Sequence, residues 1–375
     1  MLAAIFWTCA GLIVYTHVGY PAVLWVLTRL RRGTERPATA GTAHTPSVSL
    51  VVAAYDEEDV IGGKVADALA LDYPRGSLEV IVASDGSTDA TVQRAREAGA
   101  DLVLDLSRGG KLAAQDAAAG QASGEVLAFS DANSAWRPDA LRRLVEPFAD
   151  PAVAYVCGQV RFLDSGGDNV EGAYWRYEMA VREMESALGG VTGGNGAIYA
   201  VRGDSYMPLP PAASHDLSLP FELARRGGRS LYEPSALAEE KMVPTLEGEF
   251  ARKRRMMVGL WDIVVGERMV SPRGYPPLFA FQLASHRLLR YSTPFLHLVG
   301  LGTNLALLGE GWVYTATLAA QGALLLGALL ARPLPLTPLR IARYYVMTTT
   351  SIAAGLWDRF RKGAPAAWEK APGTR

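Results

Sequence analysis

Three short acidic segments carry the side chains best suited to bind a charged ligand. They are Asp56-Glu57-Glu58, Asp85-Gly86-Ser87-Thr88-Asp89 and Asp131-Ala132-Asn133. Carboxylates that gather in one place repel one another unless cations or hydrogen-bond donors share the site. Oxygen ligands of this kind suit Mg²⁺ or Mn²⁺ held beside a phosphate-bearing molecule. Taken singly, Asp56 and Asp85 could equally be helix caps or turn formers.

The elements that must position these segments can be read from the apolar pattern. Continuous apolar runs of strand length occur at Val48–Ala54, Leu78–Ala83, Leu102–Leu106 and Val126–Phe129. Helical patterns lie between and after them, at Glu57–Leu71, Asp89–Ala98, Lys111–Ala122 and Pro138–Phe148. Strands that are apolar on both faces and alternate with helices predict an α/β fold, with a mostly parallel sheet covered on both sides. The acidic segments follow the first, second and fourth strands, so they should meet at the carboxyl edge of the sheet, where such sheets bind ligands.

Three further segments suggest ligand contacts. Lys111 stands at a helix start, where the helix dipole disfavours a cation unless an anion is bound nearby. The glycine-rich Gly193–Gly196 allows the backbone to approach a ligand closely, although it could also be a bare turn before a strand at Ala197–Val201. Ser214-His215-Asp216 opens a helix that reaches Arg226, and Asp216 there is either a proton acceptor or a helix cap.

Composition limits the classes of function. The 375 residues contain 37 Lys and Arg against 38 Asp and Glu, a formal net charge of -1, which gives no basic face for a nucleic acid. Two cysteines, Cys9 and Cys157, offer neither a disulfide framework nor metal-ligand spacing. Hydrophobic residues make up 49% of the chain, a share that leaves room for membrane-spanning segments.

The N-terminal segment is long and apolar enough to cross a bilayer. Residues 2–28 contain no charged side chain, and a crossing needs about 20 residues. A cleaved signal peptide would need a basic start, but here Arg29, Arg31 and Arg32 follow the apolar run. A retained anchor fits better, with the basic flank and the central region on the cytoplasmic side.

A second apolar region runs from Tyr291 to Ala331 and is about twice the length of one crossing. Gly309-Glu310-Gly311 interrupts it, so we expect a hairpin of two spans with basic residues at both flanks. The segment 341–357 is either a further span or a helix lying in the membrane interface. The interfacial alternative keeps the basic tail in the cytoplasm, and residues 281–290 have a similar interfacial pattern.

The ordered set of motifs resembles the family-2 inverting glycosyltransferases of the GT-A fold. It comprises VSLVVAAYDEE at Val48–Glu58, DGSTD at Asp85–Asp89, Gly110-Lys111, Asp131-Ala132-Asn133 and GGNGAIYAVR at Gly193–Arg202. The flanking spans and the closing Trp368-Glu369-Lys370 resemble the membrane-bound branch that includes cellulose-synthase-like and poly-N-acetylglucosamine-synthase-like enzymes. This resemblance implies sugar transfer from a nucleotide-sugar donor, with a UDP-sugar expected, to a glycan or lipid-linked acceptor.

The resemblance also implies roles for individual residues. Those matched to the donor nucleotide are Ala53, Tyr55, Glu57, Asp85, Lys111 and Asp131. Asp131 and Asn133 stand where the family has its Asp-x-Asp motif for Mg²⁺ or Mn²⁺, so one ligand here is a neutral amide. Asp216 stands in the position of the catalytic base, where His215 replaces a usual acid.

The acceptor and diphosphate positions matched by the resemblance are Gly194, Asn195, Arg252 and Arg255. The synthase branch has Gln-x-x-Arg-Trp at the last of these, whereas this chain has Arg252-Lys253-Arg254-Arg255-Met256. Methionine packs on a sugar ring less specifically than an indole, which argues against long-chain processive synthesis. A basic cluster that faces lipid head groups is the alternative interpretation.

These inferences combine into one expected organisation. Residues 1–32 form a transmembrane anchor, 33–46 a linker, 47–270 a cytoplasmic GT-A catalytic domain and 271–290 an interfacial helix. Residues 291–331 form a transmembrane hairpin, and 332–375 an interfacial helix and cytoplasmic tail. The expected enzyme sits in the cell membrane, contacts membrane lipids and serves polysaccharide or envelope glycan synthesis. The competing hypothesis is a membrane scaffold that binds sugar nucleotides without catalysis, for which Asn133 and Met256 would be signs of lost activity.

Overall fold

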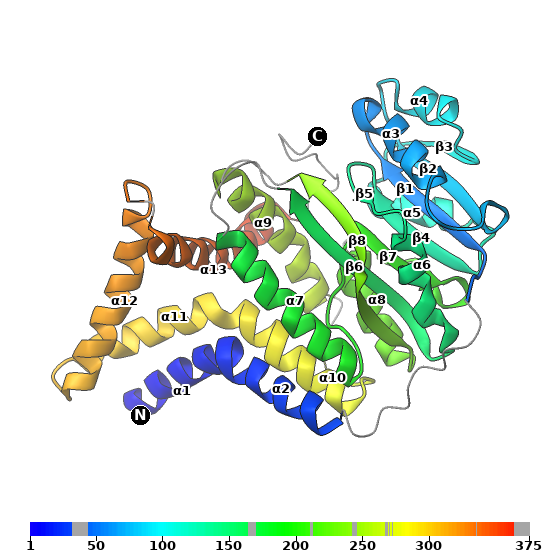
Figure 1. Ribbon diagram of the computed structural model, residues 1–375. Helices are drawn as coiled ribbons and strands as arrows, with labels where there is room; N and C mark the ends of the chain where they lie inside the picture. Colours follow the sequence, from blue (N-terminus) through cyan, green and yellow to red (C-terminus); the bar gives the residue numbers. More distant parts are fainter. Residues whose placement is uncertain are drawn as a thin grey trace.

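The computed structural model describes most of the chain. The described ranges are residues 1–31, 44–163, 170–210, 213–241, 246–266, 273–334 and 336–363, together with Met269 and Ser271. Most of the expected linker, residues 33–43, and the closing Trp368-Glu369-Lys370 lie outside them. Figure 1 shows an α/β part built on one sheet, with long helices that extend away from it on one side.

A single mixed sheet forms the centre of the α/β part. Within the described ranges it has eight strands in the order β3-β2-β1-β4-β7-β6-β8-β5. Their bounds are β1 Val48–Ala54, β2 Leu78–Asp85, β3 Leu102–Leu106, β4 Val126–Asp131, β5 Ala135–Trp136, β6 Val153–Leu163, β7 Ile198–Arg202 and β8 Arg229–Lys241. All four strands predicted from the apolar runs are present, and β2 and β4 extend by two residues to include Asp85 and Asp131.

The strand directions place the carboxyl ends at one edge. Strands β1, β2, β3 and β4 are mutually parallel, while β7 pairs antiparallel with both β4 and β6. Strand β8 runs parallel to β6, so every long strand except β7 ends at the same edge. Because β7 starts there, with Ile198 opposite Ser130, the Gly193–Gly196 segment reaches the same edge as the acidic segments.

Helices cover both faces of the sheet, as the α/β prediction required. Their bounds are α3 Glu58–Leu69, α4 Thr91–Glu97, α5 Lys111–Ala119, α6 Ala140–Val145, α7 Val170–Leu188 and α8 His215–Arg225. Helices α3 and α4 bury Ile61, Val65 and Ala95 against Val52 and Val82. The side chains of Val51 and Ile81 point to the opposite face, where Ala114 and Ala118 of α5 cover them. This alternation is what strands that are buried on both faces require.

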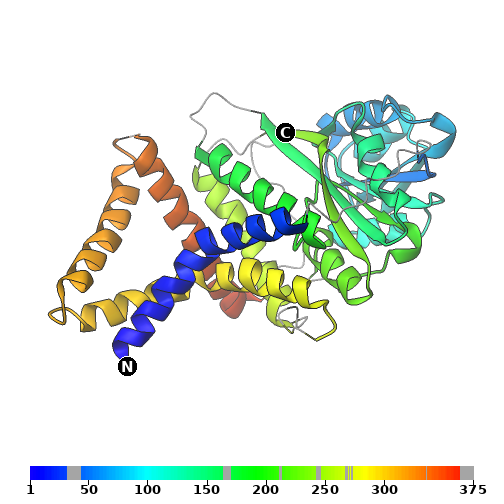
Figure 2. The same cartoon turned by 60° about the horizontal axis from the view of Figure 1, so that its bottom comes forward.

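The N-terminal segment forms one helical element with a change of pitch in its middle. It comprises α1 Leu2–Val14, the π-helical turn η1 Tyr15–Gly19 and α2 Tyr20–Arg31. Figures 1 and 2 both show α1 alongside α11 and α2 alongside α7, so its two halves have different partners. By length and composition, Leu2–Arg31 and Trp312–Leu330 are the two helices in the described ranges that could cross a membrane.

The C-terminal third is helical. Its elements are α9 Leu246–Trp261, η5 Asp262–Gly266, α10 Pro277–Gln282, η6 Leu283–Leu288, α11 Leu289–Ala306, α12 Trp312–Leu330 and α13 Thr337–Lys362. The chain turns between α11 and α12, where Gly309-Glu310-Gly311 predicted a turn. Helices α10, η6 and α11 follow one another without a break across the expected boundary at residue 290. Within the expected interfacial segment 271–290, the side chains of Gln282, Ser285 and His286 are buried.

Helix α13 returns to the α/β part instead of continuing outward. Figures 1 and 2 show α11, α12 and α13 arranged as three sides of a triangle, with the far end of α13 beside α9. Arg254 of α9 pairs with Asp358, and Arg359 pairs with Asp262 of η5. The Trp261 indole N–H also donates to the Ile352 carbonyl oxygen at 3.2 Å. The C-terminal end of α13 therefore packs against α9 and η5, the helical elements that follow the sheet.

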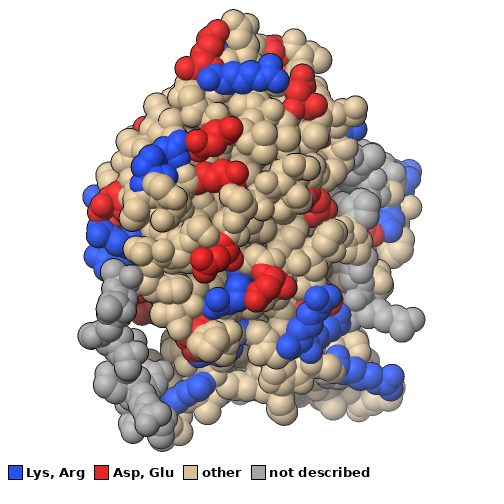
Figure 3. Space-filling view, turned by 90° about the vertical axis from the view of Figure 1, so that its right-hand side faces the viewer, with Lys and Arg blue, Asp and Glu red and all other residues tan. Residues whose placement is uncertain are grey.

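The surface of the α/β part carries charges of both signs. In Figure 3 the lysine and arginine side chains are interspersed with aspartate and glutamate, and no broad basic field covers that face. This distribution agrees with the formal net charge of -1.

Candidate active site

The charged centre of the site is an ion pair between the ends of two neighbouring elements. Lys111 opens α5, Asp131 closes β4, and the Lys111 ammonium group contacts Asp131 Oδ1. Burial opposes the charge on Lys111, but attraction to Asp131, with weaker contributions from Asp216 and Glu240, outweighs burial and raises the pKa of Lys111. A cation therefore sits where the resemblance implied contact with a diphosphate.

The oxygens available for a divalent ion are few. Asp131 and Asn133 are both half-buried, and Ala53, which lies beside Asp131 in the β1–β4 register, is buried. In the part of the chain that the structure describes, no three His, Cys, Asp or Glu side chains converge on a metal-sized site. Mg²⁺ commonly takes one or two carboxylates and completes its shell with substrate phosphates and water. The residues present fit an ion of that kind, held by Asp131 and Asn133 with the donor supplying the remaining oxygens.

The contact of Arg108 with Tyr55 and Asp85 at this edge of the sheet was not predicted from the sequence. The Arg108 guanidinium lies 3.4 Å from the centre of the Tyr55 ring and pairs with Asp85 Oδ2 at 2.5 Å. Asp85 Oδ1 accepts hydrogen bonds from the backbone N–H groups of Gly109 and Gly110, at 2.6 and 2.9 Å. Asp85 is 1% exposed, so it holds the Arg108–Gly110 loop while Tyr55 and Arg108 remain the more accessible groups. The sequence feature that could have indicated a role for Arg108 is its position just before Gly109-Gly110-Lys111.

The first acidic segment forms a turn that is hydrogen-bonded to the residues of the second segment. Asp56 has a positive φ of 49°, and its Oδ1 accepts from the Thr88 N–H at 2.7 Å. Glu57 is buried, with its N–H donating to Thr91 Oγ1, and the Glu58 N–H donates to Asp89 at 3.2 Å. The turn-former alternative is therefore correct for Asp56. These hydrogen bonds tie the first two acidic segments together, and Arg94 and Arg108 pair with Glu58 and Asp85.

The Gly193–Gly196 segment lies between the ion pair and the start of α8. The Gly194 N–H donates to the Asp216 carbonyl oxygen at 2.6 Å, and Asn195 is anchored by its side-chain amide to the Gly158 carbonyl oxygen at 2.5 Å. A Cβ atom at Gly196 would lie 3.9 Å from Lys111 Nζ, and one at Gly194 only 1.9 Å from the Tyr155 hydroxyl. No side chain fits at Gly194. The structure therefore brings Lys111, Gly194 and Asp216 to one place.

Helix α8 begins with one buried and one accessible residue. His215 is 4% exposed, and its Nδ1 lies 2.6 Å from the Tyr199 hydroxyl, within an aromatic group that also includes Phe129 and Tyr206. Asp216 is half-buried in the first turn, and Ser214, not Asp216, occupies the N-cap position. Within the described ranges the Asp216 carboxylate makes no hydrogen bond or ion pair. His215 thus anchors the helix start, and the cap interpretation of Asp216 loses its basis.

The buried state of His215 predicts a pH dependence of stability. Burial, together with the charge on Lys111, lowers the pKa of His215 from 6.5 to about 3. Between these two values the unfolded chain binds a proton that the folded chain does not, so stability is lost as pH falls below about 6.5. In detergent-solubilised protein, we expect the melting temperature to fall less between pH 7 and pH 5 for His215→Gln than for the wild type. His44→Gln is the control, and equal pH slopes for His215→Gln and wild type would contradict the assignment.

The basic segment of α9 is divided between two faces. Lys253 contacts the Tyr344 hydroxyl and Arg254 pairs with Asp358, so these two side chains hold α13. Arg252 and Arg255 are three residues apart and therefore share the other face of the helix. Arg252 is half-buried there, and Arg255 is exposed. Met256 is 50% exposed, where the synthase branch has its tryptophan. A diphosphate role for Arg252 and Arg255 stays a prediction.

A buried lysine supports the Asp131–Asn133 turn and also escaped sequence interpretation. Lys64 of α3 is 4% exposed, and its ammonium group donates to the Ser134 carbonyl oxygen at 2.6 Å. Burial lowers the pKa of Lys64 to about 7, against the attraction of Asp67, Asp131 and Glu240. In the sequence, Lys64 lies on the apolar face of a predicted helix, and nothing in that pattern predicts this contact.

Comparison with known families decides the class of the protein. The profile of glycosyl transferase family 2 matches residues 49–201, and the profile of glycosyl transferase family group 2 matches residues 127–356, more than half of the chain. The chain belongs to the family-2 glycosyltransferases. Sugar transfer is thus the activity of its family, which argues against the non-catalytic scaffold.

Relatives of this glycosyltransferase are named for different products and sugars. It is 34% identical over 150 residues to a β-monoglucosyldiacylglycerol synthase of Synechocystis, covering 34% of this chain and 31% of that protein. It is 27% identical over 243 residues to an N-acetylglucosaminyltransferase of Rhizobium meliloti, covering 58% and 57%. Identity to the poly-β-1,6-N-acetyl-D-glucosamine synthase of Staphylococcus aureus is 23% over 267 residues, covering 67% and 63%. The chain thus spans from about a third to less than two thirds of the length of these relatives.

The fold comparison covers nearly the whole chain. The mannosyltransferase PcManGT of Pyrobaculum calidifontis, solved with GDP-mannose and Mn²⁺, matches with a TM-score of 0.73 at 22% identity. The match covers 96% of this chain and 99% of that one, and includes the helical elements outside the sheet. The GT-A fold expected from the sequence is confirmed.

Proposed function

We propose that this glycosyltransferase moves a hexose or N-acetylhexosamine, with inversion, from a UDP-linked donor to a glycan or lipid-linked acceptor. The transfer takes place at the cytoplasmic face of the cell membrane, and its product enters extracellular polysaccharide or another envelope glycan. One observation carries the proposal. The Lys111–Asp131 pair lies beside Gly196, and the Asp216 backbone accepts a hydrogen bond from Gly194, so the proposed donor and acceptor groups converge at one strand edge.

Each part of the site has a separate task in this proposal. Tyr55 and Arg108 offer a ring and a planar cation to the nucleotide base and ribose, and Lys111 offsets the diphosphate charge. Mg²⁺ or Mn²⁺ held by Asp131 and Asn133 would stabilise negative charge on the departing nucleoside diphosphate. Asp216 accepts the proton of the acceptor hydroxyl as that oxygen attacks the anomeric carbon. An inverting displacement needs this carboxylate opposite the leaving group, and Asp216 comes from a different element than the ion pair.

The names of the relatives support the donor class. Three of them are named for the transfer or polymerisation of glucosyl or N-acetylglucosaminyl units. The direct test offers radiolabelled UDP-glucose, UDP-N-acetylglucosamine and GDP-mannose to detergent-solubilised protein with Mn²⁺, and follows label into lipid and polymer fractions. We expect one UDP-sugar to be consumed. Consumption of GDP-mannose alone would overturn the donor assignment, and absence of any turnover would overturn the proposed activity.

The helical elements support a location in the membrane. Leu2–Arg31 and Trp312–Leu330 have the length and composition of spans, and α12 exposes Leu325, Leu326 and Leu329. The ion pairs that join α13 to α9 and η5 keep its far end beside the catalytic part. This contact supports the interfacial interpretation of residues 341–357, because a further span would carry Asp358 to the opposite side.

Topology mapping tests the arrangement. We expect single cysteines placed in the region from Gly33 to Phe279, and in the tail after Phe360, to be protected from a membrane-impermeant thiol reagent in intact cells. A cysteine at Glu310 should be labelled, since it lies in the turn between α11 and α12. Labelling of the tail from outside would mean that residues 341–357 cross the bilayer, despite the Arg254–Asp358 pair.

A further inference from the structure

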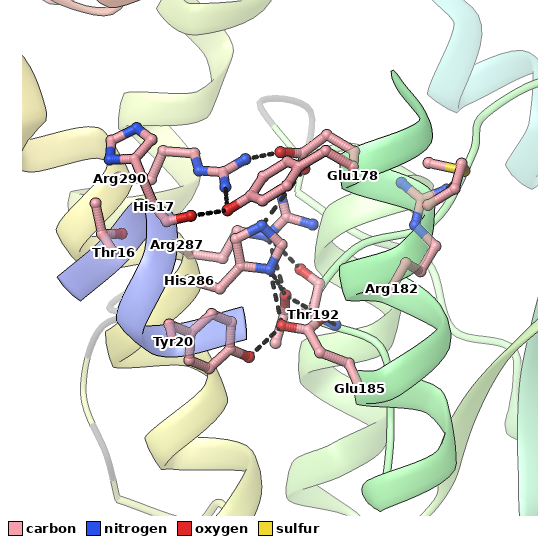
Figure 4. Close-up of polar contacts among 12 residues, drawn as sticks. Thr16, His17, Tyr20, Glu178, Arg182, Glu185, Thr192, His286, Arg287 and Arg290 are labelled. Carbon is pink, nitrogen blue, oxygen red and sulfur yellow. Dashed lines mark hydrogen bonds and ion pairs between the residues drawn. The ribbon is translucent and has the colours of Figure 1, made fainter. Parts of the chain in front are cut away.

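A buried polar cluster joins the N-terminal helix to the helices beside the active site. Its members, here called the Glu185 cluster, are Tyr20 of α2, Glu185 of α7, Thr192, and His286 and Arg287 of η6 (Figure 4). The Glu185 and His286 side chains are only 1% and 2% exposed. The proposed chemistry uses none of these residues, and they are separated by up to 267 positions along the chain.

Glu185 accepts hydrogen bonds from several different segments. The Tyr20 hydroxyl donates to Oε1 at 2.5 Å, and His286 Nδ1 lies 2.7 Å from the same oxygen. The backbone N–H and the hydroxyl of Thr192 donate to Oε2, at 3.1 and 2.9 Å. One carboxylate thus fixes the N-terminal helix, η6 and the residue just before Gly193 relative to one another.

The cluster continues directly into the acceptor loop, Thr192–Asn195. Arg287 Nε donates to the Thr192 carbonyl oxygen at 2.8 Å and to its hydroxyl at 3.1 Å. A Cβ atom at Gly193 would lie 2.2 Å from Arg287 Nη2, so the loop backbone is packed against this guanidinium. Arg182, also on α7, donates to the Gly194 carbonyl oxygen at 3.1 Å. The next contact is the hydrogen bond from the Gly194 N–H to the Asp216 carbonyl oxygen.

The electrostatics keep Glu185 ionised. Burial opposes its charge, but His286, Arg287 and the Tyr20 hydrogen bond outweigh burial and lower the pKa of Glu185 to about 2. A buried ionised group of this kind is a poor source of stability compared with apolar packing, and its best-attested use is to specify one geometry.

We infer that Glu185 is a positioning residue for the acceptor loop, and that the Tyr20 hydroxyl makes the N-terminal helix a working part of the acceptor site. This inference rests on the proposed function, in which the acceptor binds between the loop and Asp216. If Thr192 loses its anchor, Gly194 shifts against Asp216, and the acceptor hydroxyl is no longer held in line with the donor. Donor contacts at Tyr55, Arg108 and Lys111 lie on other elements and stay in place.

Tyr20→Phe removes only the hydroxyl that Glu185 accepts. We expect the acceptor kcat/KM to fall about tenfold, the worth of a buried hydrogen bond to a charged group. Nucleotide affinity and the slow hydrolysis of donor by water should remain unchanged. The matched control is Tyr15→Phe, which removes the hydroxyl bonded at 2.9 Å to Ser285 Oγ and therefore also loosens α1–α2 from η6, without touching Glu185.

Two further measurements separate positioning from general loosening. Thr192→Val removes the hydroxyl on the loop side, so Tyr20→Phe and Thr192→Val should be non-additive in acceptor kcat/KM, while Tyr15→Phe and Thr192→Val add. Hydrogen exchange of the peptide containing residues 191–195 should accelerate in Tyr20→Phe and not in Tyr15→Phe. This exchange readout does not depend on activity.

The outcomes distinguish this inference from the proposed function. If wild type transfers no sugar, the proposed function fails, while the exchange result still reports whether the cluster holds the loop. If wild type is active and Tyr20→Phe matches Tyr15→Phe in acceptor kcat/KM and in exchange, the inference is overturned. The same holds if Tyr20→Phe weakens donor binding as much as acceptor use.

Discussion

Asp216→Asn is expected to lower the rate of sugar transfer by a factor of about 10² or more, the usual worth of general-base catalysis. Asparagine has nearly the same size but cannot accept the acceptor's proton at neutral pH. Donor affinity should change little, because the proposed donor contacts lie on or next to β1, β4 and α5, and not on α8.

The structure supports this expectation by removing the competing roles of Asp216. Ser214 holds the N-cap position, so Asp216 is not needed to cap α8. Asp85 is satisfied by Arg108 and two backbone N–H groups, and Asp131 is engaged by Lys111, so neither is available beside the acceptor loop. The Asp216 carbonyl oxygen accepts the Gly194 N–H, and the Asp216 carboxylate is close enough to Lys111 to contribute to the raised pKa of that lysine.

The measurement is initial-rate kinetics with titrated donor and acceptor, together with melting temperature. Glu222→Gln is a matched control, since Glu222 lies on the same helix and pairs with Arg225 at 2.6 Å, away from the loop. The control should retain wild-type transfer. Normal transfer by Asp216→Asn would show that Asp216 is only an acidic residue in a first helical turn.

Asp131→Ala is expected to reduce metal-dependent transfer by a factor of roughly 10³, because several kcal/mol of charge stabilisation depend on its carboxylate. It is the one charged oxygen ligand in the Asp131–Asn133 turn. Its loss also leaves Lys111 without the carboxylate that raises its pKa. The fold should survive, because Asp131 is half-buried and lies at the end of β4. Residues 126–130 of that strand are held by their pairing with β7.

Two measurements separate a metal role from a purely electrostatic partnership with Lys111. Mn²⁺ binding in the presence of UDP, followed by electron paramagnetic resonance, should be lost in Asp131→Ala. Asn133→Asp should retain activity and bind Mn²⁺ more tightly, because it restores a second carboxylate. Wild-type turnover by Asp131→Ala at ordinary Mg²⁺ would refute the assignment, as would unchanged Mn²⁺ binding.

The sheet was largely predictable because strands buried on both faces leave a local signature. The predicted bounds of β1 and β3 match the structure, and β2 and β4 were short only by the polar residues at their ends. Those residues include Asp85 and Asp131, whose type argues against a strand although the ladder hydrogen bonds continue through them. The pattern also indicated correctly which ends of the strands share an edge.

The helical boundaries outside the sheet were less predictable. Residues 277–290 alternate Leu and Phe with Arg, His and Gln, a pattern that an interfacial helix and a helix docked on protein share. Only the tertiary structure distinguishes them, because Gln282 and His286 find buried partners on α7. Likewise, no local feature shows that residues 341–362 return to α9, since that depends on Arg254 and Arg359 meeting carboxylates about a hundred residues away in the chain.

The sequence by itself determined the fold class, the edge at which the acidic segments lie and the order of the motifs, since each depends on patterns within a few neighbouring residues. It left open whether Asp56 and Asp216 are turn formers, caps or functional groups. The tertiary structure decided that Asp56 is a turn former, that His215 is a buried anchor and that Ser214 occupies the cap position next to Asp216. It also revealed that the Arg108 guanidinium stacks on the Tyr55 ring, and that Glu185 is the centre of a buried polar cluster. Their partners are brought together only when distant segments pack, because the energy of a polar contact depends on burial and on a partner that the local sequence does not contain.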